Sequence, residues 1–550
     1  MTRKLNKEMV SQFIAKNKST QFIYIGLIFM LILHGVSIGF QFLNNSFNPD
    51  ESLVVNLVRE VGFGEFRDRY PTHFGAIVQF YYLGYFPGFD VKTLQFFAAL
   101  FLALNAIYSI WVIRSYRLLE PFYMFLYIGV LSLSDPNHHY GTWGLFQYSQ
   151  AILASTVILH ILLFLSRLSF NYPSIWYQII VCCLPVLLIV NFGPNLLAAV
   201  VMAGASFLSV GFKFRGEPTE VRKLFVRALP LFISIMIGGI VTLKWLAHAE
   251  FREPREVIRW LYFPYSDYTQ NIPGAVEYLK DHSINLIQTI WRPNRLLANE
   301  FPIFKSSIVT GILFTLFALG LAGSLRKTAE LRLPVALYLL GSYGTMAAAG
   351  LHGSYAFGEV RYSLLLLIPT YVITAQGARD VCAFCALRIK SLGLPLVRSG
   401  MYVRSIFAIV VGLLLIFLLS ITTRNISRET FRFNSEFDST VQELSEISES
   451  LVIWDAYTGQ TLEYMNVIPN DSKSFFLDRA FLRAPENSVV NLDQLELLVR
   501  QSPTIVTVTY WPLSHSAYEK IRLNLGKNHI LTSSYGVNRL RVSRWTNHSE

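Results

Sequence analysis

Polar side chains that can act on a substrate gather in a few short stretches of an otherwise apolar chain. The first, Asn48-Pro49-Asp50-Glu51-Ser52, places two adjacent carboxylates just after the first long apolar run. A carboxylate in this position can take the proton from an attacking hydroxyl, which is general base catalysis. The same stretch also suits a helix start, because asparagine caps, proline fits the first turn and acids favour the positive end of the helix dipole.

Three further stretches add histidines, two more acids and an arginine beside a tyrosine. They contain Tyr70 and His73; Asp135, His138 and His139; and His352, Glu359, Arg361 and Tyr362. An arginine offers a fixed cation to a phosphate group. Asp135 and His138 offer ligands to a divalent metal ion, although adjacent histidines on a short loop are more typical of a solvated turn. Glu359 and Arg361 can also simply pair with each other.

These stretches belong to a membrane protein. The chain has 550 residues, of which 53% are hydrophobic and 15% charged, and its mean hydropathy is +0.40. This composition is too apolar for a soluble protein of this length. The formal net charge of +11 does not indicate a nucleic-acid partner, because lysines and arginines lie mostly in short segments between apolar runs.

Apolar runs of about 20 residues predict about eleven transmembrane helices. If the N-terminus is cytoplasmic, the short basic segments fall on the cytoplasmic side, and the four polar stretches and the C-terminus fall on the outer side. The spans are expected near 22–43, 93–113, 121–134, 146–165, 174–190, 194–212, 228–246, 304–323, 333–351, 362–377 and 405–421.

The pattern divides the chain into a transmembrane domain, 1–421, and an outer α/β domain, 422–550. The membrane domain has a first outer loop of 44–92 and a long outer loop of 247–303, in which EFREPREVIRWLYF and IPGAVEYLKDHSINLIQTIW predict amphipathic surface helices. In the outer domain, LVIWDAY and TIVTVTYW predict strands, and QLELLVRQ and SAYEKIRLNL predict helices. SSYGVNRLRVSRW predicts a strand pair around a glycine turn.

The order of these features resembles the GT-C superfamily of polytopic glycosyltransferases, which use sugars carried on polyprenyl or dolichyl phosphate. The resemblance covers residues 1–421 in outline and rests on NPDES, YPTHFGAIVQFYYLGYF and HGSYAFGEVRYSLLLLIP. Within this superfamily, the chain is similar to the protein O-mannosyltransferase and aminoarabinose transferase types. The C-terminal region carries no WWD-type motif, which argues against an oligosaccharyltransferase.

The resemblance implies a polytopic, GT-C-like helical fold and inverting transfer of a sugar from a polyprenyl-phosphate donor to an acceptor hydroxyl. The topology and the lack of a retention signal favour a bacterial inner membrane with a periplasmic C-terminal domain, and the acceptor is expected to be a glycan, a lipid or a protein. The acids of this chain are compatible with a bound Mg²⁺ or Mn²⁺ but do not require one, and Asp135 and His138 are the candidate ligands. The other implied roles are Asp50 as base assisted by Glu51; Arg361, Tyr362 and His352 at the donor phosphate; and Asp135, His73, Tyr70 and Glu359 at the acceptor.

Two other classes stay open. A multi-pass polysaccharide polymerase or ligase relies on outer-loop arginines, and the long outer loop supplies Arg255, Arg259 and Arg292. A lipid-linked glycan transporter requires ionisable residues inside the spans, where charge is costly and tends to be functional. The predicted spans are nearly free of acids, with Lys244 as the main charged exception, which disfavours transport.

Overall fold

The computed structural model describes most of the chain and divides it into two compact units. Unit 1 comprises Met1–Gly39, Pro71–Gln79 and Gln95–Ile426, and unit 2 comprises Phe40–Tyr70, Phe80–Leu94 and Ser427–Glu550. The described residues are 21, 24–40, 42–43, 49–69, 74–139, 147–167, 183–190, 195–213, 218–248, 272–304, 307–326, 331–352, 357–358, 363–391, 400–445, 451–455, 473–477, 492–510, 522–523, 525–537 and 540–547.

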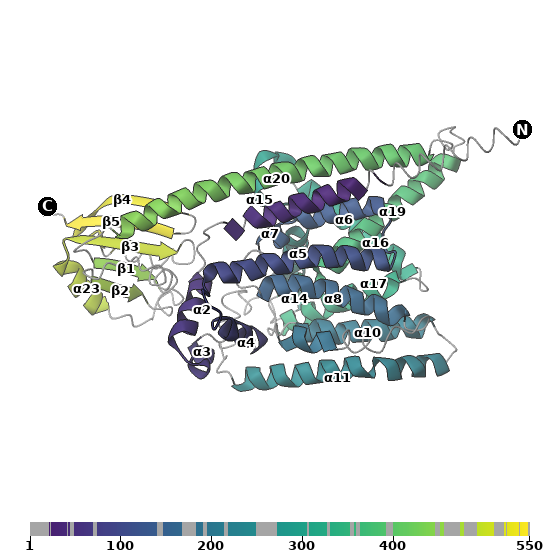
Figure 1. The fold of residues 1–550 in the computed structure, drawn as a ribbon, viewed down its shortest axis with the longest axis horizontal. Coiled ribbons are helices and arrows are strands. Elements are labelled where there is room, and N and C mark those ends of the chain that lie inside the picture. Colours follow the sequence, from purple (N-terminus) through teal and green to yellow (C-terminus); the bar gives the residue numbers. More distant parts are fainter. Residues whose placement is uncertain are drawn as a thin grey trace, which may run out of the picture. The chain divides into compact units, whose positions relative to one another are not determined.

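The prediction of a polytopic helical protein is confirmed, because each of the expected spans overlaps a helix in the described part of the chain (Figure 1). Five helices there are long and apolar enough to cross a membrane, and four more are apolar but shorter. The helices that overlap the eleven expected spans are 24–40, α5 (Val91–Ser115), α6 (Pro121–Leu133), α8 (Gln147–Arg167), 183–190, α10 (Asn195–Lys213), α11 (Pro218–His248), α16 (Ser307–Arg326), α17 (Arg332–Leu351), α19 (Leu367–Ser391, preceded by η2, Leu364–Leu366) and α20 (Gly400–Ser445).

Shorter helices lie between these spans. They are α2 (Pro49–Glu60), α3 (Phe63–Arg69), α4 (Phe74–Leu83), α7 (Asp135–His139), α14 (Ile272–Ile290), α15 (Arg295–Glu300) and η1 (Pro302–Phe304). The prediction of an amphipathic helix at α14 is confirmed, since Tyr278, Leu286 and Ile290 are buried while Glu277, Lys280 and Asp281 are exposed. The companion stretch EFREPREVIRWLYF lies outside the described residues.

α20 has 46 residues and is far longer than the apolar run that predicted it. The apolar pattern fades near residue 421, yet the helix continues to Ser445. The sequence from Ser420 to Ser445 contains no glycine or proline. Nothing in it therefore interrupts the backbone hydrogen bonds, and hydropathy alone did not predict where this helix ends.

Two glycines bring α16 and α19 into backbone contact inside unit 1. A Cβ atom on Gly377 would overlap the carbonyl oxygen of Leu316, and one on Gly320 would overlap the carbonyl oxygen of Ile373. Helix backbones in a membrane approach this closely only where both carry small residues, because packing rather than hydrophobicity drives their association.

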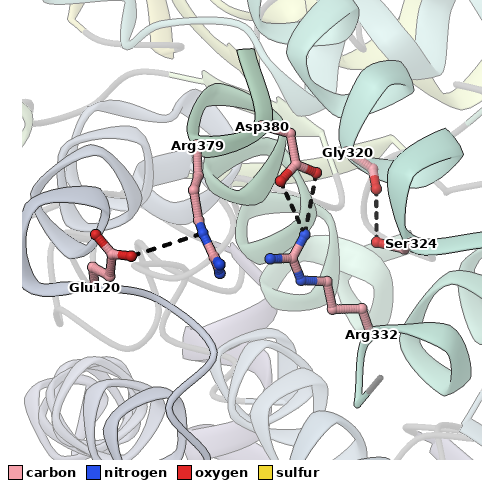
Figure 2. Close-up of polar contacts among 6 residues, drawn as sticks. All are labelled: Glu120, Gly320, Ser324, Arg332, Arg379 and Asp380. Carbon is pink, nitrogen blue, oxygen red and sulfur yellow. Dashed lines mark hydrogen bonds and ion pairs between the residues drawn. The ribbon is translucent and has the colours of Figure 1, made fainter. Parts of the chain in front are cut away.

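Charged side chains tie α6, α17 and α19 together at one end of the helix bundle, which we call the basic end (Figure 2). The guanidinium of Arg332, which is buried, lies 3.1 Å from a carboxylate oxygen of Asp380, and Arg379 lies 3.9 Å from Glu120. Gly323 leaves room for the Asp380 carboxylate, because a Cβ there would lie 2.7 Å from Oδ2. We call the opposite ends of these helices, at Leu133, Leu351 and Leu367, the loop end.

The C-terminal part of unit 2 is a mixed five-stranded sheet with the order β2-β1-β3-β5-β4. β1 pairs in parallel with β2 and β3, whereas β5 pairs antiparallel with β3 and β4. The strands are β1 (Leu451–Asp455), β2 (Lys473–Leu477), β3 (Thr504–Tyr510), β4 (His529–Val537) and β5 (Leu540–Asn547), and α23 (Leu492–Gln501) precedes β3.

The sheet confirms the predicted strands at LVIWDAY and TIVTVTYW, the predicted helix at QLELLVRQ and the terminal strand pair. The position of the turn was wrong: Gly536 lies inside β4 and pairs with Arg541, and the strands join after Val537. Strand β2, with the sequence KSFFL, was not predicted. Of SAYEKIRLNL, only residues 522–523 and 525 are described, and they are helical.

The glycine contact predicts a stability difference between two substitutions of the same type. Gly377→Ala should destabilise the protein by roughly 1–3 kcal/mol, the usual cost of overpacking. Gly311→Ala is the control, because no atom lies within 4 Å of a Cβ placed there. Thermal unfolding in detergent should show a lower midpoint for Gly377→Ala alone. Equal midpoints for the two variants would contradict the proposed backbone contact.

Candidate functional site

The acid pair Asp50-Glu51 lies in the first turn of α2, in unit 2. The helix begins at Pro49, as the sequence predicted. Glu51 is only 1% exposed and lies on the face of α2 that buries Val54 and Val55. Burying a carboxylate without partners is costly, and Glu51 interacts electrostatically with Lys92 at the start of α5. Glu51 is thus placed to hold α2 in position.

Several contacts fix the neighbourhood of α2 within unit 2. Lys92 Nζ donates to the carbonyl of Phe42 at 3.3 Å and lies over the Phe42 ring. Arg59, near the end of α2, donates to the carbonyl of Phe89 at 2.8 Å. Asp90 caps α5, because its carboxylate accepts the Thr93 N–H at 2.8 Å. The first-loop helix is therefore joined to the start of α5 by side-chain contacts.

In unit 1, the end of α6 forms a short antiparallel bridge with the turn after α14. Ser134 and Pro293 are the bridging pair. The Asp135 N–H donates to the carbonyl of Arg292 at 2.8 Å, and the Asn294 N–H donates to the carbonyl of Leu133 at 2.7 Å. Two segments that are far apart in sequence thus meet at the loop end, and Asp135 is held against the turn that carries Arg292 and Arg295.

The electrostatic surroundings of Asp135 are mixed. Burial raises the pKa of its carboxyl, and this outweighs the opposite effects of the guanidiniums of Arg295 and Arg292 and of a hydrogen bond from the Arg295 backbone. Both arginine side chains are exposed. Asn137 is 2% exposed, and its Nδ2 has no hydrogen-bond partner among the described residues. A partly buried acid beside two accessible cations can bind a ligand that carries both an anion and hydroxyl groups.

Side chains of α16 and α19 hold the turn after α14 in place. The Tyr371 hydroxyl donates to the carbonyl of Ile290 at 2.9 Å, and Trp291 Nε1 lies 3.4 Å from Thr374 Oγ1. The Trp291 ring packs on Phe314 and Phe317 at centroid distances of 5.6 and 5.1 Å. Because Trp291 is buried and hydrogen-bonded, the Arg292–Arg295 turn is fixed relative to the bundle.

The remaining residues expected at the site are placed only in part. His352 is exposed and is the C-cap of α17. His138 and His139 lie in α7, of which the structure describes the backbone at these positions. Tyr70, His73, Glu359, Arg361 and Tyr362 lie outside the described residues. Among the residues that are described, no group of three or more His, Cys, Asp or Glu side chains could hold a metal ion.

The proximity of Asp135 to Arg292 and Arg295 was not predicted from the sequence. Arg292 was named only as one of the long-loop arginines that a polymerase or ligase would use. The sequence signal was the WRPNR turn, in which two arginines flank a proline directly after an amphipathic helix. That signal places cations after a helix but does not indicate which acid they face.

The sequence matches no protein-family model and no curated protein. Among solved structures, the chain is similar to ArnT from Cupriavidus metallidurans bound to undecaprenyl phosphate, with 13% identity, 96% of this chain and 98% of that chain covered, and a TM-score of 0.47. It is also similar to the archaeal oligosaccharyltransferase AglB from Archaeoglobus fulgidus in complex with an inhibitory peptide and a dolichol-phosphate, with 11% identity, coverage of 88% and 69%, and a TM-score of 0.48.

The raised pKa of Asp135 predicts how stability responds to Asp135→Asn. A carboxyl whose folded-state pKa lies above its ordinary value destabilises the fold when ionised, and this penalty disappears below the ordinary pKa of about 3.9. The variant should therefore melt at the same temperature as the wild type or about 1–2 °C higher at pH 7.5, with the difference shrinking toward pH 4.

The control for this comparison is Glu277→Gln, at an exposed position of α14. It should leave the melting temperature unchanged at both pH values. A clear loss of stability in Asp135→Asn at pH 7.5 would contradict the prediction, since it would mean that the arginines outweigh the cost of burial.

Proposed function

We propose that the protein is a GT-C-type membrane glycosyltransferase that moves a sugar from a polyprenyl-phosphate donor to an acceptor hydroxyl. The observation that carries the proposal is the Asp135 carboxylate held beside Arg292 and Arg295 at the loop end of an apolar helix bundle. A lipid phosphate with an attached sugar presents an anion at headgroup depth next to hydroxyl groups. Guanidiniums suit the anion, and a carboxylate suits the hydroxyls.

In the proposed reaction the acceptor oxygen attacks the anomeric carbon, and the bond between that carbon and the phosphate oxygen breaks with inversion. Asp50 takes the proton of the acceptor hydroxyl. Its place in the first turn of α2 supports this role, because the positive end of the helix dipole favours the ionised carboxylate that a base requires. Buried Glu51 assists by holding the helix.

The leaving group is a lipid phosphate whose negative charge grows as the bond breaks. Arg361, with Tyr362 and His352, is proposed to stabilise it, and Arg292 and Arg295 add two exposed cations at the loop end. Asp135, Tyr70, His73 and Glu359 are proposed to contact the acceptor, which is a glycan, a lipid or a protein.

Mg²⁺ or Mn²⁺ fits the described surroundings of Asp135 poorly. The groups that act on this carboxylate are two guanidiniums and a backbone N–H, all of which favour an anion over a divalent cation. The proposed reaction therefore uses no metal-dependent step. For His138, the other candidate ligand, the structure describes only the backbone, which lies in α7.

We further propose that the loop end faces outward from a bacterial inner membrane and that the N-terminus is cytoplasmic. The helix ends and short turns at the basic end carry several arginines. This supports the proposed orientation, because arginines are enriched on the cytoplasmic side of membrane proteins. Those arginines are Arg114, Arg117, Arg326, Arg332, Arg379 and Arg388.

A polysaccharide polymerase or ligase is the second candidate. The exposure of Arg292 and Arg295 on the long outer loop favours it, because such enzymes depend on outer-loop arginines. The two candidates differ in the first-loop acid, which the glycosyltransferase needs as a base and the ligase does not.

The first test of the proposal is Asp50→Asn. Turnover should fall by about 10² to 10⁴, the usual contribution of general base catalysis. The measurement is release of polyprenyl phosphate from a panel of polyprenyl-phosphate monosaccharides in proteoliposomes. Glu65→Gln, an exposed acid in α3, is the matched control and should keep full activity. Undiminished turnover in Asp50→Asn would contradict the proposed glycosyltransferase mechanism, in which Asp50 is the base.

The second test concerns the two arginines of the α14–α15 turn. Arg292→Gln and Arg295→Gln should each raise the donor KM by about 10- to 100-fold, because a hydrogen bond to a charged group contributes roughly 1.5–3 kcal/mol. Lys280→Gln removes an exposed cation from α14 and serves as the control. If Arg292→Gln abolished activity while Asp50→Asn did not, the polymerase or ligase would be favoured instead.

A further inference from the structure

An uncharged aromatic stretch joins α4 to α5 in unit 2. Residues 81–89 read YYLGYFPGF and contain no charged side chain. Within this stretch Tyr82, Tyr85 and Phe86 are 62%, 67% and 63% exposed. We call these three rings the aromatic elbow. Scattered exposed apolar side chains are normal, but a group of large ones in one place marks a surface that contacts a partner.

Contacts among the rings hold the elbow in a fixed arrangement. The Tyr85 hydroxyl donates to the Tyr81 hydroxyl at 2.9 Å. The Tyr81 ring meets Tyr85 edge-on at a centroid distance of 5.4 Å and meets Phe63 of α3 at 5.2 Å. The Tyr82 and Tyr85 rings lie 6.3 Å apart. Phe63 and Tyr81, which are partly buried, therefore form an inner layer that supports the exposed tyrosines.

The backbone of the elbow is fixed to α2. A Cβ atom on Gly84 would overlap Cγ1 of Val58, so the chain runs directly against this helix. Gly88 then turns the chain toward α5 with a φ of +77°, a conformation that glycine adopts at no steric cost. Beyond the turn, Arg59 of α2 donates to the carbonyl of Phe89 at 2.8 Å. The elbow and α2 therefore form one packed element.

The elbow lies where the chain enters the membrane. α5 begins at Val91, five residues after Phe86, and its 25 residues are long and apolar enough to cross a bilayer. At 1.5 Å per residue the helix is about 38 Å long, more than the hydrocarbon core of about 30 Å, so its first turn reaches the headgroup region. In this turn Lys92 Nζ donates to the carbonyl of Phe42, two residues after the apolar helix 24–40. Two apolar helices thus end close to the elbow.

We propose that the aromatic elbow is an interfacial anchor, which inserts Tyr82, Tyr85 and Phe86 into the headgroup region of the leaflet where α5 begins. Tyrosine suits this place because its ring is apolar and its hydroxyl is polar, and aromatic residues are enriched at membrane–water interfaces. The elbow continues directly into a helix that is apolar enough to cross the membrane, which favours phospholipid over a second protein as the partner.

The anchor also sets the height of α2 relative to the bilayer. Gly84 packs against α2, and Arg59 bonds the same helix to the carbonyl of Phe89. Moving α2 away from the membrane therefore means withdrawing three aromatic rings from the interface or breaking these contacts. The inference concerns a contact with lipid, and it holds whichever reaction the protein catalyses.

The first test measures the depth of nitroxide labels on the full-length protein. The four cysteines of the chain are replaced by alanine, and single cysteines are introduced by Tyr82→Cys and Phe86→Cys. Ile107→Cys, at a 64% exposed position of α5, is the lipid reference, and Lys527→Cys, at an exposed position before β4, is the water reference. In vesicles of phosphatidylcholine and phosphatidylglycerol, power saturation gives the accessibility of each label to oxygen and to a polar nickel chelate.

The ratio of oxygen to nickel accessibility should be roughly five- to tenfold higher at positions 82 and 86 than at 527, and lower than at 107, because oxygen concentrates in lipid and the chelate does not. A ratio equal to that at 527 means that the elbow faces water, and one equal to that at 107 means that it lies in the hydrocarbon core. Low accessibility to both reagents means that a second protein surface or a bound glycan covers the elbow. Each of these three results would overturn the proposal.

A second test keeps the natural cysteines, so it does not depend on the cysteine-free background. Phe86→Trp places an indole on the elbow, and Lys527→Trp is the control. Phospholipids brominated near the carbonyl groups should quench the fluorescence added by Phe86→Trp more strongly than phospholipids brominated near the chain ends. Neither lipid should quench the fluorescence added by Lys527→Trp. Equal emission of Phe86→Trp in brominated and unbrominated vesicles would contradict the interfacial anchor.

Discussion

The candidate site depends on the backbone bridge between the end of α6 and the turn after α14. A helix leaves its last carbonyls without partners, and the Asn294 N–H satisfies one of them, the carbonyl of Leu133. The reciprocal bond, from the Asp135 N–H to Arg292, fixes the next residue after α6. The contact that completes the helix end therefore also brings an acid next to two arginines. Main-chain bonds supply this constraint, so it does not depend on particular side chains at Ser134 and Pro293.

A second level of order comes from α14, which connects the parts of the loop end. Its C-terminal end is fixed to α19 by Tyr371 and by Trp291 just beyond it, and its middle is fixed to α17 through Ser283 and Tyr343. The turn containing Phe357 and Gly358 packs on the same helix. An amphipathic helix that looked like a surface feature in the sequence is thus a support for the segments around it, because its buried face is shared by several partners.

The elements could be predicted from the sequence where one physical signal was strong. Apolar runs of about 20 residues predicted the spans, short apolar stretches of strand character predicted β1 and β3, and Asn-Pro-Asp-Glu predicted the start of α2. The end of α20 and the position of Gly536 were missed because neither depends on hydropathy. The contact of Asp135 with Arg292 and Arg295 could not be predicted, since it is made by tertiary packing between two loops. The short motifs gave the types of chemical group but not their neighbours.

α17 and α19 are held together at both ends of the helix bundle. At the basic end the buried guanidinium of Arg332 pairs with Asp380, and at the loop end both helices are bonded to α14. α19 is in addition in backbone contact with α16 through Gly377. Alternating access requires one group of helices to rock against another, so that a central site opens first to one side and then to the other. Helices joined at both ends resist such rocking.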